Sequence, residues 1–166
     1  GGDIKAMLEM DLEPDTARKA EMFAGILDTK AVLHSLETLG VPVAVGINGA
    51  ALGGGFEIAL ACHYRIATEG AVVGLPESQL GLMPGADGVV RVTRLIGMQE
   101  AISLISQGTR LKARKALEKG LLHEVVATEA QMHPQARAWL LTNPEARQPW
   151  EREDYRMPGG GPDHKA

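Results

Sequence analysis

The sequence predicts an α/β fold, in which short strands and helices alternate along the chain. Two patterns support this prediction: apolar residues recur at helical spacing in several segments, and brief β-branched runs separate those segments. A third observation is that the 20 glycines and 9 prolines fall mostly between the two kinds of segment, where they indicate turns. The 166 residues are 45% hydrophobic and 23% charged, a balance typical of a globular domain.

The first long periodic segment predicts a helix that starts at Asp15, a residue suited to the N-cap. Its apolar positions continue to Leu39, where Gly40 and Pro42 form a strong stop signal. The residues 41–47 are then expected to form a short buried strand, followed by a turn at Asn48-Gly49.

The rest of the chain continues the alternation. We expect helices over 56–62, 89–96, 99–106, 112–119 and 128–141, strands over 64–67, 71–73 and 122–126, and a loop over 76–88. The domain is predicted to cover residues 1–142, and residues 143–166 are expected to be a Pro/Gly-rich linker or tail. The opening Gly-Gly-Asp-Ile-Lys suggests a start partway through a larger domain.

Composition excludes several classes of protein. A net charge of −4 and a pI near 5.7 leave no basic surplus for binding nucleic acid. No apolar run reaches the roughly 18 residues that a membrane-spanning helix needs. The single cysteine, Cys62, rules out an intrachain disulfide and fits a reducing compartment. The 5 histidines show no metal-ligand spacing, so no metal site is expected.

The most informative local feature is the glycine run that precedes the helix expected at 56–62. Glycines at a helix start expose backbone N–H groups, which can bind a phosphate or a carbonyl oxygen that gains negative charge. Phosphate-loop and dinucleotide patterns both fail, because no Gly-Lys-Ser/Thr follows and Gly53, Gly54 and Gly55 are contiguous. An oxyanion hole is therefore the better functional hypothesis, and a tight strand-to-helix turn explains the glycines equally well.

Two candidate carboxylates follow the glycine run in the sequence. Glu57 lies in the first turn of the predicted helix, where a glutamate also simply complements the helix dipole. Glu77 lies in an apolar loop, where desolvation favours a raised pKa, although bonding to backbone amides is an equally good explanation. Together they suggest acid–base chemistry beside a polarised carbonyl.

The segment from Asn48 to Cys62, with the later Leu75-Pro-Glu-Ser-Gln-Leu-Gly-Leu-Met-Pro-Gly85, resembles the signature of the enoyl-CoA hydratase/isomerase (crotonase) superfamily. Gly1-Gly-Asp-Ile-Lys5 is similar to that family's first oxyanion segment, and the likeness extends over roughly residues 1–140. Residues 62–67 and the tail around Asn143 and Trp150 look most like the hydratase portion of the multifunctional fatty-acid oxidation complex alpha-subunit.

The resemblance implies a spiral of ββα units, here lacking its N-terminal strands. It implies hydration of a trans-2-enoyl-CoA by Glu57 and Glu77, with the backbone N–H groups of Gly2 and Gly54 as the oxyanion hole. It also implies substrate contacts at Asp3, Ile4, Gly53, Pro76 and Gly85. Coenzyme A would be the substrate carrier, with no permanently bound cofactor. A homo-oligomer (trimer) or a multienzyme complex, in a bacterial cytoplasm or another reducing compartment, is expected.

Alternative functions remain open from the sequence. An isomerase or dehalogenase of the same family would use the oxyanion hole and tolerate loss of one of Glu57 and Glu77. A catalytically silent CoA-binding or scaffold domain is a second alternative, and a nucleotide-binding module is the weakest. Asp87 departs from the family pattern, since relatives often carry a glycine or another small residue there.

Overall fold

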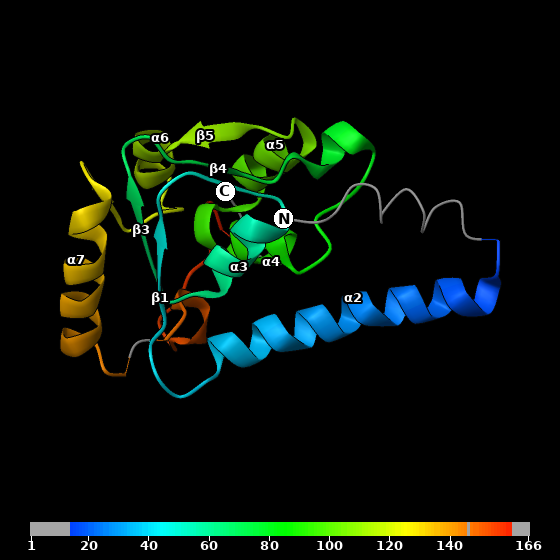
Figure 1. Ribbon diagram of the computed structural model, residues 1–166, viewed down its shortest axis with the longest axis horizontal. Coiled ribbons are helices and arrows are strands. Elements are labelled where there is room, and N and C mark those ends of the chain that lie inside the picture. Colours follow the sequence, from blue (N-terminus) through cyan, green and yellow to red (C-terminus); the bar gives the residue numbers. More distant parts are fainter. Residues whose placement is uncertain (1–13, 146, 161–166) are drawn as a thin grey trace.

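The computed structural model describes residues 14–145 and 147–160 and confirms an α/β architecture (Figure 1). Its helices are α2 (Thr16–Glu37), α3 (Gly54–Ala61), α4 (Gly88–Ile96), α5 (Met98–Ser106), α6 (Ala113–Glu118) and α7 (Glu129–Thr142). The described residues also form two short 3-10 helices, η1 (Pro76–Leu80) and η2 (Pro149–Glu151). The strands are β1 (Ala44–Ile47), β2 (Ala50–Leu52), β3 (Tyr64–Thr68), β4 (Val72–Gly74), β5 (Arg110–Lys112) and β6 (Glu124–Val126).

Consecutive strands enter two different sheets. Strands β1, β3 and β6 form one parallel sheet, in which Ile66 is opposite both Gly46 and Glu124. Strands β2, β4 and β5 form the second sheet, parallel between β2 and β4 and antiparallel between β4 and β5. Because each pair of strands is followed by a helix (β1-β2-α3, then β3-β4-α4), the chain advances by repeated strand–strand–helix units. This order matches the expected ββα spiral.

Strands β2 and β5 were not predicted from the sequence, and some predicted boundaries differ from those in the structure. Strands β2 and β5 have only three residues each, too few to show alternation; Leu111 is the sole buried residue of β5. The predicted strand 41–47 begins only at Ala44, because the Val43 N–H donates to Nδ1 of the His63 ring instead of to a neighbouring strand. The predicted loop 76–88 contains η1, and the predicted helix 112–119 begins after β5.

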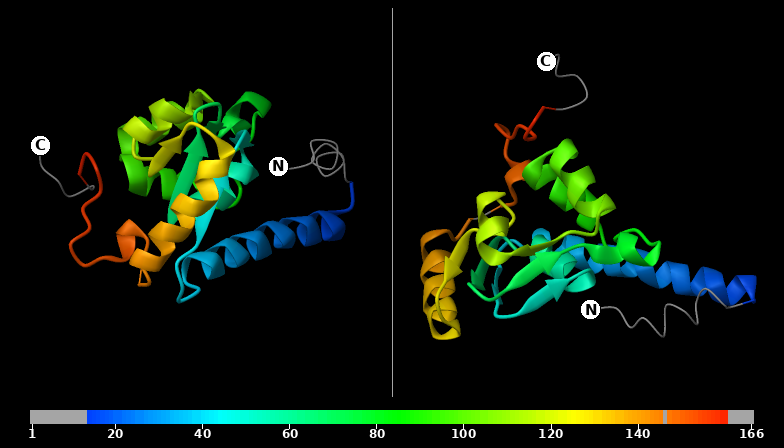
Figure 2. Two further views of the ribbon diagram at one scale, coloured as in Figure 1. Left: turned by 60° about the vertical axis from the view of Figure 1, so that its left-hand side comes forward. Right: turned by 90° about the horizontal axis from the view of Figure 1, so that it is seen from above.

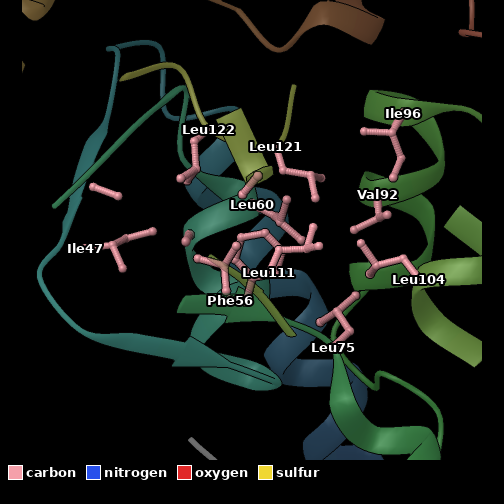
Figure 3. Packing of buried hydrophobic residues seen from close by; sticks show 14 of the residues in the cluster. Ile47, Phe56, Leu60, Leu75, Val92, Ile96, Leu104, Leu111, Leu121 and Leu122 are labelled. Atoms are coloured by element: carbon pink, nitrogen blue, oxygen red, sulfur yellow. The ribbon is translucent and has the colours of Figure 1, made fainter. Parts of the chain in front are cut away.

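The hydrophobic core surrounds α3, whose Phe56 and Leu60 are fully buried. Figure 3 shows Val92 and Ile96 of α4 directed toward Leu60, with Leu75 below them. Each large apolar side chain buried in this way contributes about 1.5–3 kcal/mol to stability. The consequence for function is rigidity, because the start of α3 is held between a sheet and a second helix.

Helix α2 is long, and its N-terminal half extends beyond the rest of the molecule (Figures 1 and 2). It begins as predicted at Asp15, whose side chain accepts hydrogen bonds from Ala17 N at 2.8 Å and from Arg18 N at 3.4 Å. Its C-terminal half joins the core, where Leu33 packs with Ala61 of α3 and Ala86. The end of α2 therefore lies against the loop that precedes α4.

The segment after α7 returns to the domain. The fully buried Gln148 donates through Nε2 to the carbonyls of Ala61 (3.1 Å) and Cys62 (3.3 Å). Tyr155 donates to the Arg94 carbonyl at 2.8 Å, and the Arg94 guanidinium lies 5.3 Å from the centre of the Trp150 ring. Residues 148–155 thus pack against the helices, and the boundary placed between 142 and 143 stays a prediction.

Within the described ranges, no helix combines the length and the apolar character that crossing a lipid bilayer requires. Cys62 is a free, buried thiol at the end of α3, and burial raises its pKa. An inert structural cysteine is what the sequence predicted for this position.

Candidate active site

The start of α3 presents open backbone donors. Gly53 is the N-cap and has a φ of 56°, a left-handed value that favours glycine, and its N–H donates to the Gly74 carbonyl at 3.0 Å. In the described part of the chain, no group accepts a hydrogen bond from the N–H of Gly54 or Gly55. A β-carbon on Gly54 would meet nothing within 4 Å. These donors can therefore bind an oxygen that carries negative charge.

Glu57 occupies the first turn of α3 and is only 3% exposed. Its Oε1 atom accepts two backbone hydrogen bonds, from Ala86 N and from Gly88 N, each at 2.8 Å. One donor comes from the loop before α4 and the other from the first residue of α4, so main-chain amides hold the side chain. Oε2 accepts no hydrogen bond from any residue that the structure describes. One carboxylate oxygen is therefore fixed, and the other remains available to a ligand.

Glu77 lies in η1, directly after Pro76, and is half-buried. Its Oε1 faces the N-cap of α3, because a β-carbon on Gly53 would lie only 3.0 Å from that atom. Its Oε2 is buried and has no hydrogen-bond partner among the described residues. Burial raises the pKa of the Glu77 carboxyl, a backbone hydrogen bond partly opposes this, and the charge of Glu57 adds to the rise.

The two glutamates thus meet at the same helix start. Glu57 lies within the first turn of α3 and Glu77 against its N-cap, close enough for the charge of one to raise the pKa of the other. A carboxyl with a raised pKa keeps its proton to a higher pH than usual, and a carboxylate oxygen without a hydrogen-bond partner can accept a proton. The pair can therefore hold one proton donor and one proton acceptor beside open amides.

The remaining predicted positions are placed as follows. Gly53 and Pro76 adjoin Gly54 and Glu77, as already described. Gly85 is exposed in the loop before α4, immediately before Ala86. The predicted residues Gly2, Asp3 and Ile4 lie outside the described residues, so the first oxyanion segment stays a prediction.

The residues that hold Glu57 were not predicted from the sequence. The donors are main-chain amides of Ala86 and Gly88, which no side-chain motif reveals. The sequence carried one signal, the glycine at position 88. The structure explains it, because a β-carbon on Gly88 would lie 2.8 Å from Glu57 Cγ and Oε1. Asp87 between them adopts a left-handed φ of 66° and pairs with Lys30 of α2 at 3.1 Å.

The fold and this geometry define a class of protein: α/β domains whose site can support acid–base chemistry next to an anion-stabilising helix start. Comparison with known families makes the assignment specific. The model of the enoyl-CoA hydratase/isomerase family matches residues 1–146, and the chain belongs to that family.

Individual relatives agree. The chain is 43% identical over 129 residues to the fatty acid oxidation complex subunit alpha of Pseudomonas syringae pv. tomato, covering 78% of this chain and 17% of that protein. The corresponding subunit of Shewanella loihica is 47% identical over 97 residues, which are 57% of this chain and 14% of that protein. The chain therefore spans less than a fifth of the length of these curated relatives.

Solved structures agree as well. An enoyl-CoA hydratase from Bacillus anthracis has a TM-score of 0.70 at 38% identity, over 75% of this chain and 48% of that chain. An enoyl-CoA hydratase from Thermoplasma volcanium has a TM-score of 0.74 at 30% identity, over 85% of this chain and 54% of that chain. These likenesses confirm the predicted crotonase-type fold, and the chain spans about half the length of the hydratases.

Proposed function

We propose that this domain adds water across the trans-2 double bond of an enoyl-CoA thioester, giving a 3-hydroxyacyl-CoA. Membership of the enoyl-CoA hydratase/isomerase family supports the substrate class. The observation that carries the reaction type is the pair of carboxyls at the start of α3, one fixed by backbone donors and one with a raised pKa. Hydration needs a base that takes a proton from water and an acid that gives a proton to C2, and the two carboxyls are the proposed base and acid.

The proposed steps follow from these positions. The free oxygen of Glu57 takes a proton from a bound water as the water oxygen bonds to C3. The π electrons of the C2=C3 bond form a C1=C2 bond while the carbonyl π electrons move onto the thioester oxygen, which gives an enolate. C2 then takes the proton held by Glu77, the enolate charge collapses, and the saturated product forms. Proton exchange with solvent returns Glu57 to its carboxylate form and Glu77 to its acid form.

The open N–H of Gly54 is the proposed partner of the thioester oxygen during the enolate stage. It lies at the positive end of the α3 dipole, where an oxygen that gains charge is stabilised. Removing one donor of this kind typically costs about 3 kcal/mol of transition-state stabilisation. Gly2 is the second donor of the proposal, and Asp3, Ile4, Gly53, Pro76 and Gly85 are its substrate contacts.

The proposal includes coenzyme A as the substrate carrier and no resident cofactor or metal, because the acid–base steps need neither. The relatives named above are subunits of fatty acid oxidation complexes, which supports a place in such a complex or in a homo-oligomer such as a trimer. A bacterial cytoplasm or another reducing compartment is the proposed location, in keeping with the single reduced cysteine.

The test is hydration of crotonyl-CoA by the full-length protein in ¹⁸O-labelled water. Loss of the conjugated thioester absorbance, with the label recovered at C3 of 3-hydroxybutyryl-CoA, is the expected result. Conversion of a 3-enoyl-CoA to the conjugated isomer with no label uptake would instead support the isomerase. Absence of both reactions, with CoA thioesters still bound, would support a scaffold domain.

A further inference from the structure

We propose that the buried ion pair between Arg91 and Glu37 positions Glu57 for reaction by fixing the carbonyl of Ala86. This inference rests on the proposed function, because it assigns a role toward one of the two reacting carboxyls. Arg91 lies on α4 and Glu37 at the end of α2, and both are nearly inaccessible, at 3% and 7% exposure. Neither residue belongs to the family signature described above.

The pair has a fork geometry. Arg91 Nε donates to Glu37 Oε1 at 2.8 Å, and Arg91 Nη2 donates to Glu37 Oε2 at 3.0 Å. A bidentate pair of this kind fixes the plane of the guanidinium as well as its position. The backbone of Glu37 is held too, because its carbonyl lies 3.0 Å from Nε2 of the buried His63, whose Nδ1 accepts from Val43 N. His34 Nδ1 lies 3.5 Å from Glu37 Oε2 and is a further ionisable group beside the pair.

The remaining arm of the guanidinium reaches the site. Arg91 Nη1 donates to the Ala86 carbonyl at 2.6 Å, and the N–H of the same residue, Ala86, donates to Glu57 Oε1 at 2.8 Å. A continuous path of hydrogen bonds therefore runs from Glu37 through Arg91 and Ala86 to Glu57. Each link in this path is buried.

Stability alone does not explain the pair. Removing two charges from water costs several kcal/mol, and replacing a buried ion pair by neutral groups of similar volume is often neutral or stabilising. The proposed role of the pair is to hold the loop before α4, so that the amides of Ala86 and Gly88 both donate to Glu57 Oε1. A misplacement of about 1 Å near a reacting group can lower the rate about a hundredfold.

The variants are chosen to separate positioning from folding. Glu37→Gln/Arg91→Gln replaces the ion pair by two neutral side chains, so no buried charge is left unpaired, and it loses the guanidinium contact to Ala86. Arg91→Lys keeps the charge and loses the fork. Arg94→Lys is the matched control, because Arg94 is on the same helix, is exposed, and lies over Trp150.

The measurements are kcat and KM for crotonyl-CoA hydration by full-length protein, with amide hydrogen exchange over residues 82–88. We expect kcat to fall about tenfold in the neutral double variant and in Arg91→Lys, with KM within about twofold of the parent. Exchange of the Ala86 and Gly88 amides should become about tenfold faster in both, and Arg94→Lys should change neither quantity.

The outcomes are distinct. A kcat within twofold of the parent in the folded double variant, or unchanged amide exchange, would overturn the positioning role. If Arg91→Lys does not fold, the double variant decides. If the parent protein does not hydrate crotonyl-CoA, the proposed function fails, and the exchange measurement still tests whether the pair holds the loop.

Discussion

The carboxylate of Glu57 and the backbone of Gly88 are in direct contact, with no room for a side chain between them. Gly88 N lies 2.8 Å from Glu57 Oε1, and a β-carbon on Gly88 would lie 2.8 Å from the same oxygen and from Glu57 Cγ. The absence of a side chain at 88 is therefore part of what places the carboxylate. The contact joins the first turn of α3 to the first residue of α4.

Gly88→Ala should therefore damage activity more than stability. The added methyl would displace the Glu57 side chain, and we expect kcat for hydration to fall about tenfold to a hundredfold. Steady-state kinetics and thermal melting are the measurements. Gly70→Ala is the control, since a β-carbon there meets nothing within 4 Å. Equal kcat values for Gly88→Ala and Gly70→Ala would contradict the contact's role.

Glu77 should make stability depend on pH in a defined direction. Because burial raises its pKa above the ordinary 4.5, the folded state retains a proton that the unfolded state releases. The folded state then binds more protons, and its stability falls as pH rises from about 4.5 through the raised pKa. Glu77→Gln removes this loss, so its melting temperature relative to the parent should be higher at pH 7 than at pH 4.

The control for this effect is Glu21→Gln, at an exposed position on α2. We expect its melting temperature relative to the parent to be the same at both pH values. A Glu77→Gln difference that is equally large at pH 4 and at pH 7 would show that ionisation of Glu77 is not opposed by the fold.

Asp87 offers a test of backbone strain beside the site. Its φ of 66° lies in the left-handed region, and its side chain pairs with the partly exposed Lys30. Asp87→Gly and Asp87→Ala both remove the ion pair, so comparing them isolates the backbone. We expect the glycine variant to be more stable by about 1 kcal/mol in urea unfolding, because a β-carbon is disfavoured there.

The same pair of substitutions at Ile102, exposed in the middle of α5, should give the opposite order. Alanine exceeds glycine in a helix interior by about 1 kcal/mol. If alanine is the more stable residue at 87 as well, the left-handed conformation of Asp87 is wrong.

The rate at which Cys62 is labelled can measure how firmly residues 148–155 pack against the domain, because Cys62 is the single cysteine of the chain. Gln148→Ala removes the donor to the Ala61 carbonyl and should cost about 1–2 kcal/mol. Opening of this region would then be about 5- to 30-fold more frequent, and labelling of the buried thiol by a disulfide reagent should accelerate accordingly. Arg152→Ala, at an exposed neighbouring position, should leave the labelling rate unchanged. Equal labelling rates in the two variants would contradict this packing.

Helix signals in the sequence were reliable where side chains alone decide the structure. Asp15 caps α2 as predicted, and the glycine run before Phe56 does precede a helix. Strands β2 and β5 escaped prediction because pairing across the sheet, rather than their own three residues, makes them strands. Short strands of this kind depend on partners distant in the sequence, such as Gly74 opposite Arg110.

The same division applies to the site. Glu57 and Glu77 were candidates because one is in the first turn of a predicted helix and the other in an apolar loop, and the family resemblance implied their catalytic roles. The structure places Glu57 in the first turn of α3 and Glu77 against its N-cap. The supports of Glu57 were not identified, because they are main-chain amides and a buried arginine brought in by the tertiary fold. Reactive side chains can be identified from the sequence, whereas the main-chain groups that position them become visible only in the fold.

The central claim is that Glu57 and Glu77 are both needed to add water to an enoyl-CoA. The most direct measurement is crotonyl-CoA hydration by full-length Glu57→Gln and Glu77→Gln, each checked for folding by its melting profile. We expect each variant to retain at most about 1% of the parent kcat, since general acid–base groups contribute about 10²–10⁴-fold. A folded variant at either position that turns over at close to the parent rate would contradict the account.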